Sequence, residues 1–126
     1  MKNTIWGTLI LLLALACSGG QAPDDISATG TWRGETVLDT LPVAVETRLV
    51  DRNGEVRGSG TFGIAGQAFE FTADGIRDGE TLFLDIVVQA YYPVTASGQV
   101  YLDSLILELN GSGFNRDAAI LRRIAP

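Results

Sequence analysis

This chain of 126 residues lacks most of the side chains that activate a nucleophile for catalysis. The chain contains no histidine, and its only cysteine and lysine are Cys17 and Lys2. Most catalytic nucleophiles need a neighbouring base such as histidine, and histidine-based zinc sites need the same side chain. Most nucleophile–base pairs are therefore excluded. We expect a protein that is not an enzyme, with no catalytic residue and no cofactor.

The carboxylates are the remaining candidates for chemistry. Asp74, Asp78 and Glu80 could offer oxygens to calcium, but their spacing matches no standard calcium loop and fits a solvated turn. Glycoside hydrolysis needs two carboxyl groups facing each other across a cleft, whereas the acidic residues here mostly alternate outward. The stretch GSGTFG at 58–63 has dinucleotide-binding spacing without the helix that would hold a pyrophosphate. We predict no metal site.

Cys17 follows an apolar run from Ile5 to Ala16 that is too short to span a membrane and has the form of a secretory signal. Ala14-Leu15-Ala16 alone would fit cleavage of a plain secreted protein. Together with Cys17, these residues resemble the lipobox of bacterial lipoproteins. The resemblance implies a signal peptide over 1–16 and a membrane anchor through lipid on Cys17. In such lipoproteins an Asp directly after the cysteine resembles a signal for retention in the inner membrane. Ser18 occupies this position here, so the resemblance also implies a place in the cell envelope, at the periplasmic face of the outer membrane.

The segment 17–27 begins with the cysteine that the resemblance implies to be lipidated. The rest of it is small, polar and interrupted by Pro23, so we expect a flexible tether. The net charge of −6 includes Lys2, which would leave with the signal, and this acidity argues against nucleic acid as a partner. Residues 28–126 are enough for one domain with a single core.

From residue 28 onward, apolar and polar residues alternate and turn residues recur, which predicts short strands. In VAVETRLV, at 43–50, alternate residues from Val43 to Leu49 would share one face. Asn53-Gly54 is a strong hairpin signal because both residues tolerate positive φ. Eight such strands are expected, with DGIRDGE at 74–80 read as a polar turn. Hairpin-length connections favour an all-β fold, a single antiparallel up-and-down barrel, with a β-sandwich as the alternative.

Gly30 and Trp32 open the first strand with a Gly-x-Trp motif, and the last strand carries Arg122 and Arg123. This combination resembles the calycins: the lipocalins, fatty-acid carriers and avidins. The resemblance implies a barrel in which an arginine of the last strand covers the tryptophan ring, which would close one end. Avidins build their biotin site with several tryptophans, whereas Trp32 is the only one after the signal segment. We do not predict biotin binding.

A non-enzymatic binding or structural role is expected, in one of two forms. The first is a carrier or sensor that takes a small apolar ligand into the barrel interior, and the candidate lining residues are Val56, Phe62, Phe69, Phe71, Leu84 and Ile86. The second is a filled barrel whose loops bind an envelope protein, with Tyr91 and Tyr92 as candidate contacts. Gly58 and Gly60, on the inward face, could make room for a ligand or for large neighbours.

Overall fold

The computed structural model describes residues 26–126, which form eight strands. The all-β prediction is confirmed for this part of the chain, and no helix within it is long and apolar enough to cross a membrane. The strands are β1 (Gly30–Leu38), β2 (Leu41–Arg52), β3 (Glu55–Ile64), β4 (Gln67–Asp78), β5 (Thr81–Val88), β6 (Val94–Val100), β7 (Ser104–Gly111) and β8 (Phe114–Ala125).

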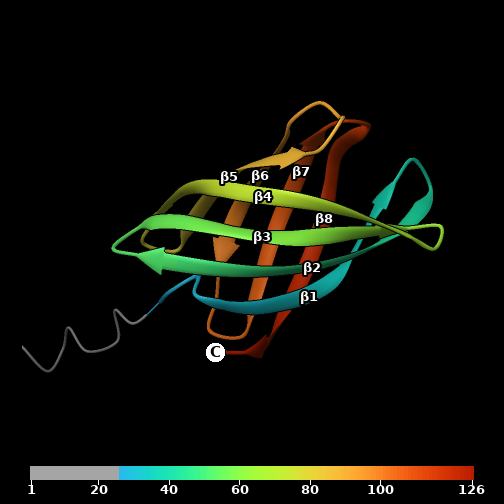
Figure 1. Ribbon diagram of the computed structural model, residues 1–126. Helices are drawn as coiled ribbons and strands as arrows, with labels where there is room; N and C mark the ends of the chain where they lie inside the picture. Colours follow the sequence, from blue (N-terminus) through green and yellow to red (C-terminus); the bar gives the residue numbers. More distant parts are fainter. Residues whose placement is uncertain (1–25) are drawn as a thin grey trace, which may run out of the picture.

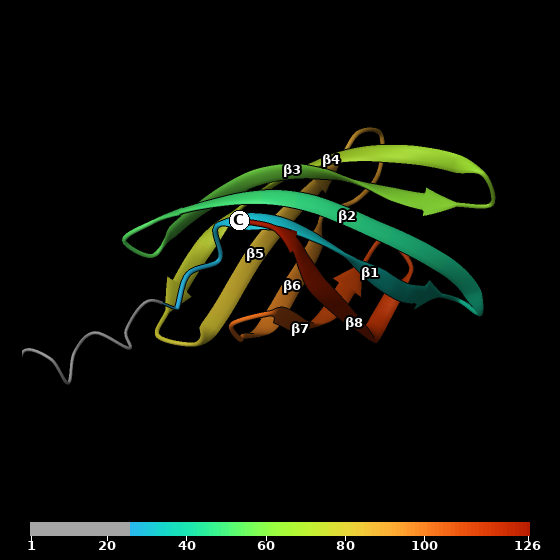
Figure 2. The same ribbon diagram turned by 90° about the horizontal axis from the view of Figure 1, so that it is seen from below.

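The eight strands form a closed antiparallel barrel in sequence order (Figures 1 and 2). Each strand pairs with the next, and β8 pairs with β1 in a register that places Gly34 opposite Leu121. Closure leaves the sheet without an unpaired edge that could recruit another strand. The up-and-down barrel is therefore confirmed, and the alternative of a β-sandwich is wrong.

Strand alternation places apolar side chains inside the barrel. In β5, Leu82, Leu84, Ile86 and Val88 are buried, while the residues between them are exposed. The prediction of a turn over residues 74–80 is wrong in extent, because β4 continues to Asp78 and only Gly79 and Glu80 separate it from β5. The β1–β2, β2–β3, β3–β4 and β7–β8 connections also have two residues, whereas three residues join β6 to β7 and five join β5 to β6. At the predicted reversal, Asn53 and Gly54 have φ values of 56° and 91°.

The two ends of the barrel differ. At one end, called the plugged end, lie the turns 52–55, 78–81 and 100–104 together with residues 26–29 and the end of β8. At the opposite end, called the mouth, lie the turns 38–41, 64–67 and 111–114 and the β5–β6 loop at 89–93. In Figure 1 the β1–β2 and β3–β4 hairpins project on the side away from the start of β1.

Side chains fill the barrel between these ends. A void of only about 20 Å³ lies among the central core residues, which is about the space needed for a single water. Gly60 contributes to this packing, because a Cβ on Gly60 would lie 2.6 Å from Cζ of Phe71. The interior glycine makes room for a large neighbour, not for a ligand.

Candidate functional site

The plugged end is organised around Trp32, which is fully buried. Its indole Nε1 donates a hydrogen bond to the carbonyl oxygen of Ala28 at 2.9 Å, and the Arg123 guanidinium carbon lies 4.2 Å from the ring centre. Arg123 also donates to the carbonyl oxygens of Ser27, Thr29 and Leu102. Residues 27–29 are thereby fixed across the barrel end by Trp32 and Arg123.

Arg122 does not take part in this contact. Arg122 lies opposite Arg33 in the register of β1 and β8, on the outer face of the sheet, and is exposed. Its inclusion among the residues expected to cover Trp32 is therefore corrected. Gly30 belongs to the plug for a steric reason. A Cβ at this position would lie 2.7 Å from Nη1 of Arg123 and 2.9 Å from the carbonyl oxygen of Ala125, and φ of Gly30 is +148°.

An ion pair between Asp51 and Arg77 also stabilises the plugged end. The Asp51 side chain is 1% exposed and accepts hydrogen bonds from the Arg77 side chain and from the backbone N–H groups of Ala28 (3.0 Å) and Gly54 (2.9 Å). Burial alone raises the pKa of Asp51, but these hydrogen bonds and the charge of Arg77 together hold it below its ordinary 3.8. Nothing in the local sequence pattern predicted this ion pair.

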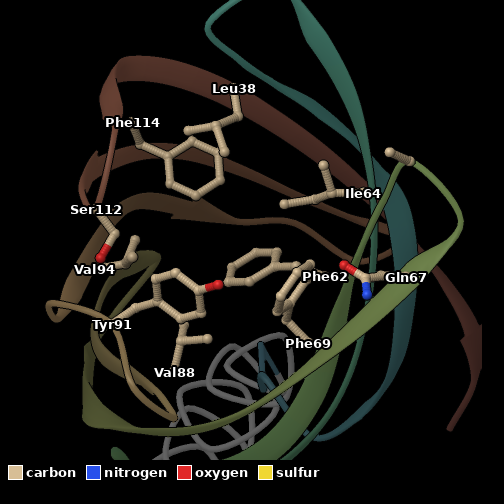
Figure 3. Close-up of a pocket in the computed structure, with 11 residues that line it drawn as sticks. Leu38, Phe62, Ile64, Gln67, Phe69, Val88, Tyr91, Val94, Ser112 and Phe114 are labelled. Carbon is tan, nitrogen blue, oxygen red and sulfur yellow. The ribbon is translucent and has the colours of Figure 1, made fainter.

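The mouth contains an apolar pocket of about 270 Å³ (Figure 3). Its polar side-chain atoms belong to Gln67, Tyr91 and Ser112, and the rest of the lining is aliphatic or aromatic. The lining consists of Leu38, Phe62, Ile64, Ala65, Gln67, Phe69, Val88, Tyr91, Val94, Ser112 and Phe114.

Aromatic rings line the boundary between this pocket and the filled core. The Phe62 ring centroid lies 4.6 Å from that of Phe71, in the core, and 5.6 Å from that of Phe114, in the pocket wall. Closer to the rim, Phe69 meets Tyr91 edge to face at 5.7 Å between centroids. Contacts of this kind add to the stability gained from burial and hold the rings in defined positions.

The six predicted lining residues separate by depth in the barrel. Phe62 and Phe69 line the mouth pocket, whereas Phe71, Leu84 and Ile86 surround the small central void. Val56 is fully buried and lies near the plugged end, next to the β2–β3 turn. The four residues other than Phe62 and Phe69 are core residues in the described structure and do not line the mouth pocket.

The two tyrosines of the β5–β6 loop have different environments. Tyr91 lines the pocket, and its ring reaches toward Phe69 and Phe62 in Figure 3, although the residue as a whole is 57% exposed. Tyr92 is 81% exposed, and its carbonyl oxygen accepts a hydrogen bond from the Ser112 hydroxyl. That hydrogen bond links the β5–β6 loop to the β7–β8 turn at the rim.

Within residues 26–126, no group of three aspartate, glutamate, cysteine or histidine side chains lies close enough together to hold a metal ion. Asp74 is exposed on the outer face and lies 3.8 Å from the Arg57 guanidinium Nε. Cys17, the signal segment 1–16 and most of the tether lie outside the described residues.

Fold and site together define a small closed β-barrel with one plugged end and one open apolar mouth. Comparisons of the chain with protein-family models, with curated proteins and with solved structures found no match.

Proposed function

We propose that this protein binds a small apolar molecule in the mouth of its barrel and acts as a carrier or sensor without catalysing a reaction. The observation that carries the proposal is the 270 Å³ pocket bounded by Phe62, Phe69, Tyr91 and Phe114. An apolar concavity with a few polar atoms is the usual form of a ligand site.

The size of the pocket limits the ligand. Drug-sized ligands occupy pockets of roughly 300–1,000 Å³, and an engineered cavity of about 150 Å³ holds benzene. At about 270 Å³, the mouth suits a compound of one or two rings or a short branched chain. The filled centre of the barrel gives a long acyl chain no room to enter further.

A matched pair of isoleucine variants tests the proposal. The barrel contains its own core, from Ala28 to Leu121, and its own closing strand pair, so residues 21–126 can be studied without the preceding segment. After exposure to an envelope metabolite extract, native mass spectrometry should detect a stoichiometric adduct. Ile64→Glu, in the pocket, should abolish the adduct, whereas Ile76→Glu, on the outer face, should retain it. A bare protein mass, or an adduct lost equally in both variants, would contradict the proposal.

We also propose that the protein is attached to the cell envelope through lipid on Cys17, on the strength of the lipobox resemblance. Residues 27 and 28 are held at the plugged end, so the tether would join the barrel at the end opposite the mouth. Replacement of Cys17 by Ser should remove the acyl mass and the membrane association. An unmodified Cys17 in the wild-type protein would contradict the anchor.

The second candidate function is binding of an envelope protein through the β5–β6 loop. Its support is the high exposure of Tyr92, which contributes no atom to the pocket lining. A photo-crosslinking residue at position 92 should capture a specific partner in cells if this function holds. The same residue at position 37, on the outer face of β1, is the control, and equal capture from both positions would argue against a partner at the loop.

A further inference from the structure

We infer that the mouth pocket selects uncharged ligands and rejects carboxylates and ammonium ions of the same shape; this rests on the proposed binding function. The residues that line the pocket include no acid and no base. A charged group placed there would lose its hydration without gaining an ionic partner, which is the most unfavourable way to bury a charge.

The charges around the rim also disfavour an anion. Asp39, in the β1–β2 turn next to the lining residue Leu38, is acidic and exposed. Arg116, two positions after the lining residue Phe114 in the β7–β8 hairpin, donates a hydrogen bond from Nε to the carboxylate of Glu108 at 3.1 Å. An incoming carboxylate would therefore meet a like charge at one turn and a partnered cation at another.

The aromatic rings do not form a cage for a cation. A cation needs an open ring face, since the attraction comes from the negative face of the π system. Phe62 packs against Phe71 on one side and Phe114 on another, and Phe69 and Tyr91 are engaged with each other edge to face. In an edge-to-face pair the edge of one ring covers a face of the other, so the Phe69–Tyr91 contact takes one of the ring faces that a cation could use.

The pocket offers neutral hydrogen-bonding groups to a ligand. The Gln67 amide can both donate and accept a hydrogen bond, and the Tyr91 hydroxyl can do the same. Figure 3 shows the two side chains on opposite walls. The chemical class that fits is a neutral apolar body with one alcohol, carbonyl or amide group.

Three compounds with one shared body test the selection: para-isopropylbenzyl alcohol, para-isopropylbenzoate and para-isopropylbenzylammonium. Calorimetry at pH 7 on residues 21–126 should give the alcohol at least about tenfold tighter binding than either ion. Tighter or equal binding of an ion would overturn the inference while leaving binding at the mouth in place. Failure of all three to bind would overturn the proposed function itself, and the inference with it.

A charge introduced into the lining should reverse the preference. In Gln67→Arg, the benzoate should bind at least about tenfold tighter than it does to the wild-type protein, because the guanidinium supplies the missing partner. Gln99→Arg adds the same charge on β6, outside the pocket, and should leave the order unchanged. Since Trp32 is buried at the other end, its fluorescence verifies that each variant is folded. A folded Gln67→Arg protein that still rejects benzoate would contradict the electrostatic explanation.

Discussion

The guanidinium carbon of Arg123 lies 4.2 Å from the centre of the Trp32 ring, although the two residues are 91 positions apart in the chain. The contact joins the first and last strands of the barrel. The same arginine donates hydrogen bonds to three carbonyl groups of residues 27, 29 and 102. One side chain therefore closes the barrel end and holds the segment that precedes β1.

Replacing Arg123 by Ala should lower the free energy of unfolding by about 2–4 kcal/mol. The loss combines a cation–π contact of about 1 kcal/mol with charged hydrogen bonds to backbone carbonyls. Arg122→Ala, one position away and on the outer face, should change it by less than about 0.5 kcal/mol. Urea denaturation followed by Trp32 fluorescence measures both, and equal effects would contradict the assignment of Arg123 as the plug.

Gly30→Ala should destabilise the barrel more than Gly66→Ala does. Both glycines have positive φ, but a Cβ at Gly30 meets Arg123 and Ala125, whereas one at Gly66 meets no atom within 4 Å. Backbone strain alone predicts about 1 kcal/mol for Gly66→Ala, and strain with steric overlap predicts about 2–4 kcal/mol for Gly30→Ala. Thermal unfolding of the two variants gives the comparison. If Gly66→Ala destabilised the barrel as much as Gly30→Ala, then Arg123 and Ala125 would be able to move away from the added methyl group at little cost in free energy.

Stability should fall in acid partly because of Asp51. Its folded pKa is below the ordinary 3.8, so the unfolded chain takes up the proton first as pH decreases. The Asp51 contribution is therefore complete well above pH 3.8 and is lost as pH falls below that value and through the lower folded pKa. Asp51→Asn should lose about 3 kcal/mol at pH 7, because Arg77 keeps a charge without its partner.

The control for that experiment is Asp74→Asn, which removes a carboxylate from an exposed ion pair and should cost less than about 1 kcal/mol. Denaturation curves between pH 2 and 7 should show a shallower acid dependence for Asp51→Asn than for the wild-type protein. Parallel pH dependence of the wild type and Asp51→Asn would mean that other carboxylates determine the acid transition.

Tyr91→Ala should weaken binding of para-isopropylbenzyl alcohol about tenfold, while Tyr92→Ala should change it by less than about twofold. Tyr91 contributes pocket surface and an edge contact to Phe69, whereas Tyr92 lies outside the lining. Titration calorimetry of the two variants is the measurement. If Tyr92→Ala were the more damaging change, the ligand would be bound by the outer surface of the loop and not by the mouth.

Strand order and hairpin positions could be predicted because alternation and turn residues are local properties. Asn53-Gly54 shows this, since the residue types themselves favour the positive φ values observed there. The choice between Arg122 and Arg123 is harder. Alternate positions of β8 carry Ile120 on one face and Leu121 on the other, so apolar character does not indicate which arginine points inward.

Depth along the barrel axis is not a local property either. Alternation places both Val56 and Phe62 inside, but the stagger between strands decides that Val56 lies near the plug and Phe62 beside the pocket. Among the lining residues that were not predicted, Ile64, Val94 and Phe114 each lie beside a connection at the mouth. Their positions next to such turns were the available signal. Asp51 and Arg77 were missed because 26 residues separate them and each lies close to a polar turn.

Thr31, beside the first residue of β1, is paired in the sheet with Ala125 near the end of the chain. The described ends of the chain are thus neighbours, and both lie on the side opposite the mouth pocket. A short Gly-Ser linker could join them in a circular permutant, with new ends opened at Asp39 and Thr40. Such a rearranged chain would carry its termini at the pocket rim, where a fused reporter domain would register ligand occupancy directly.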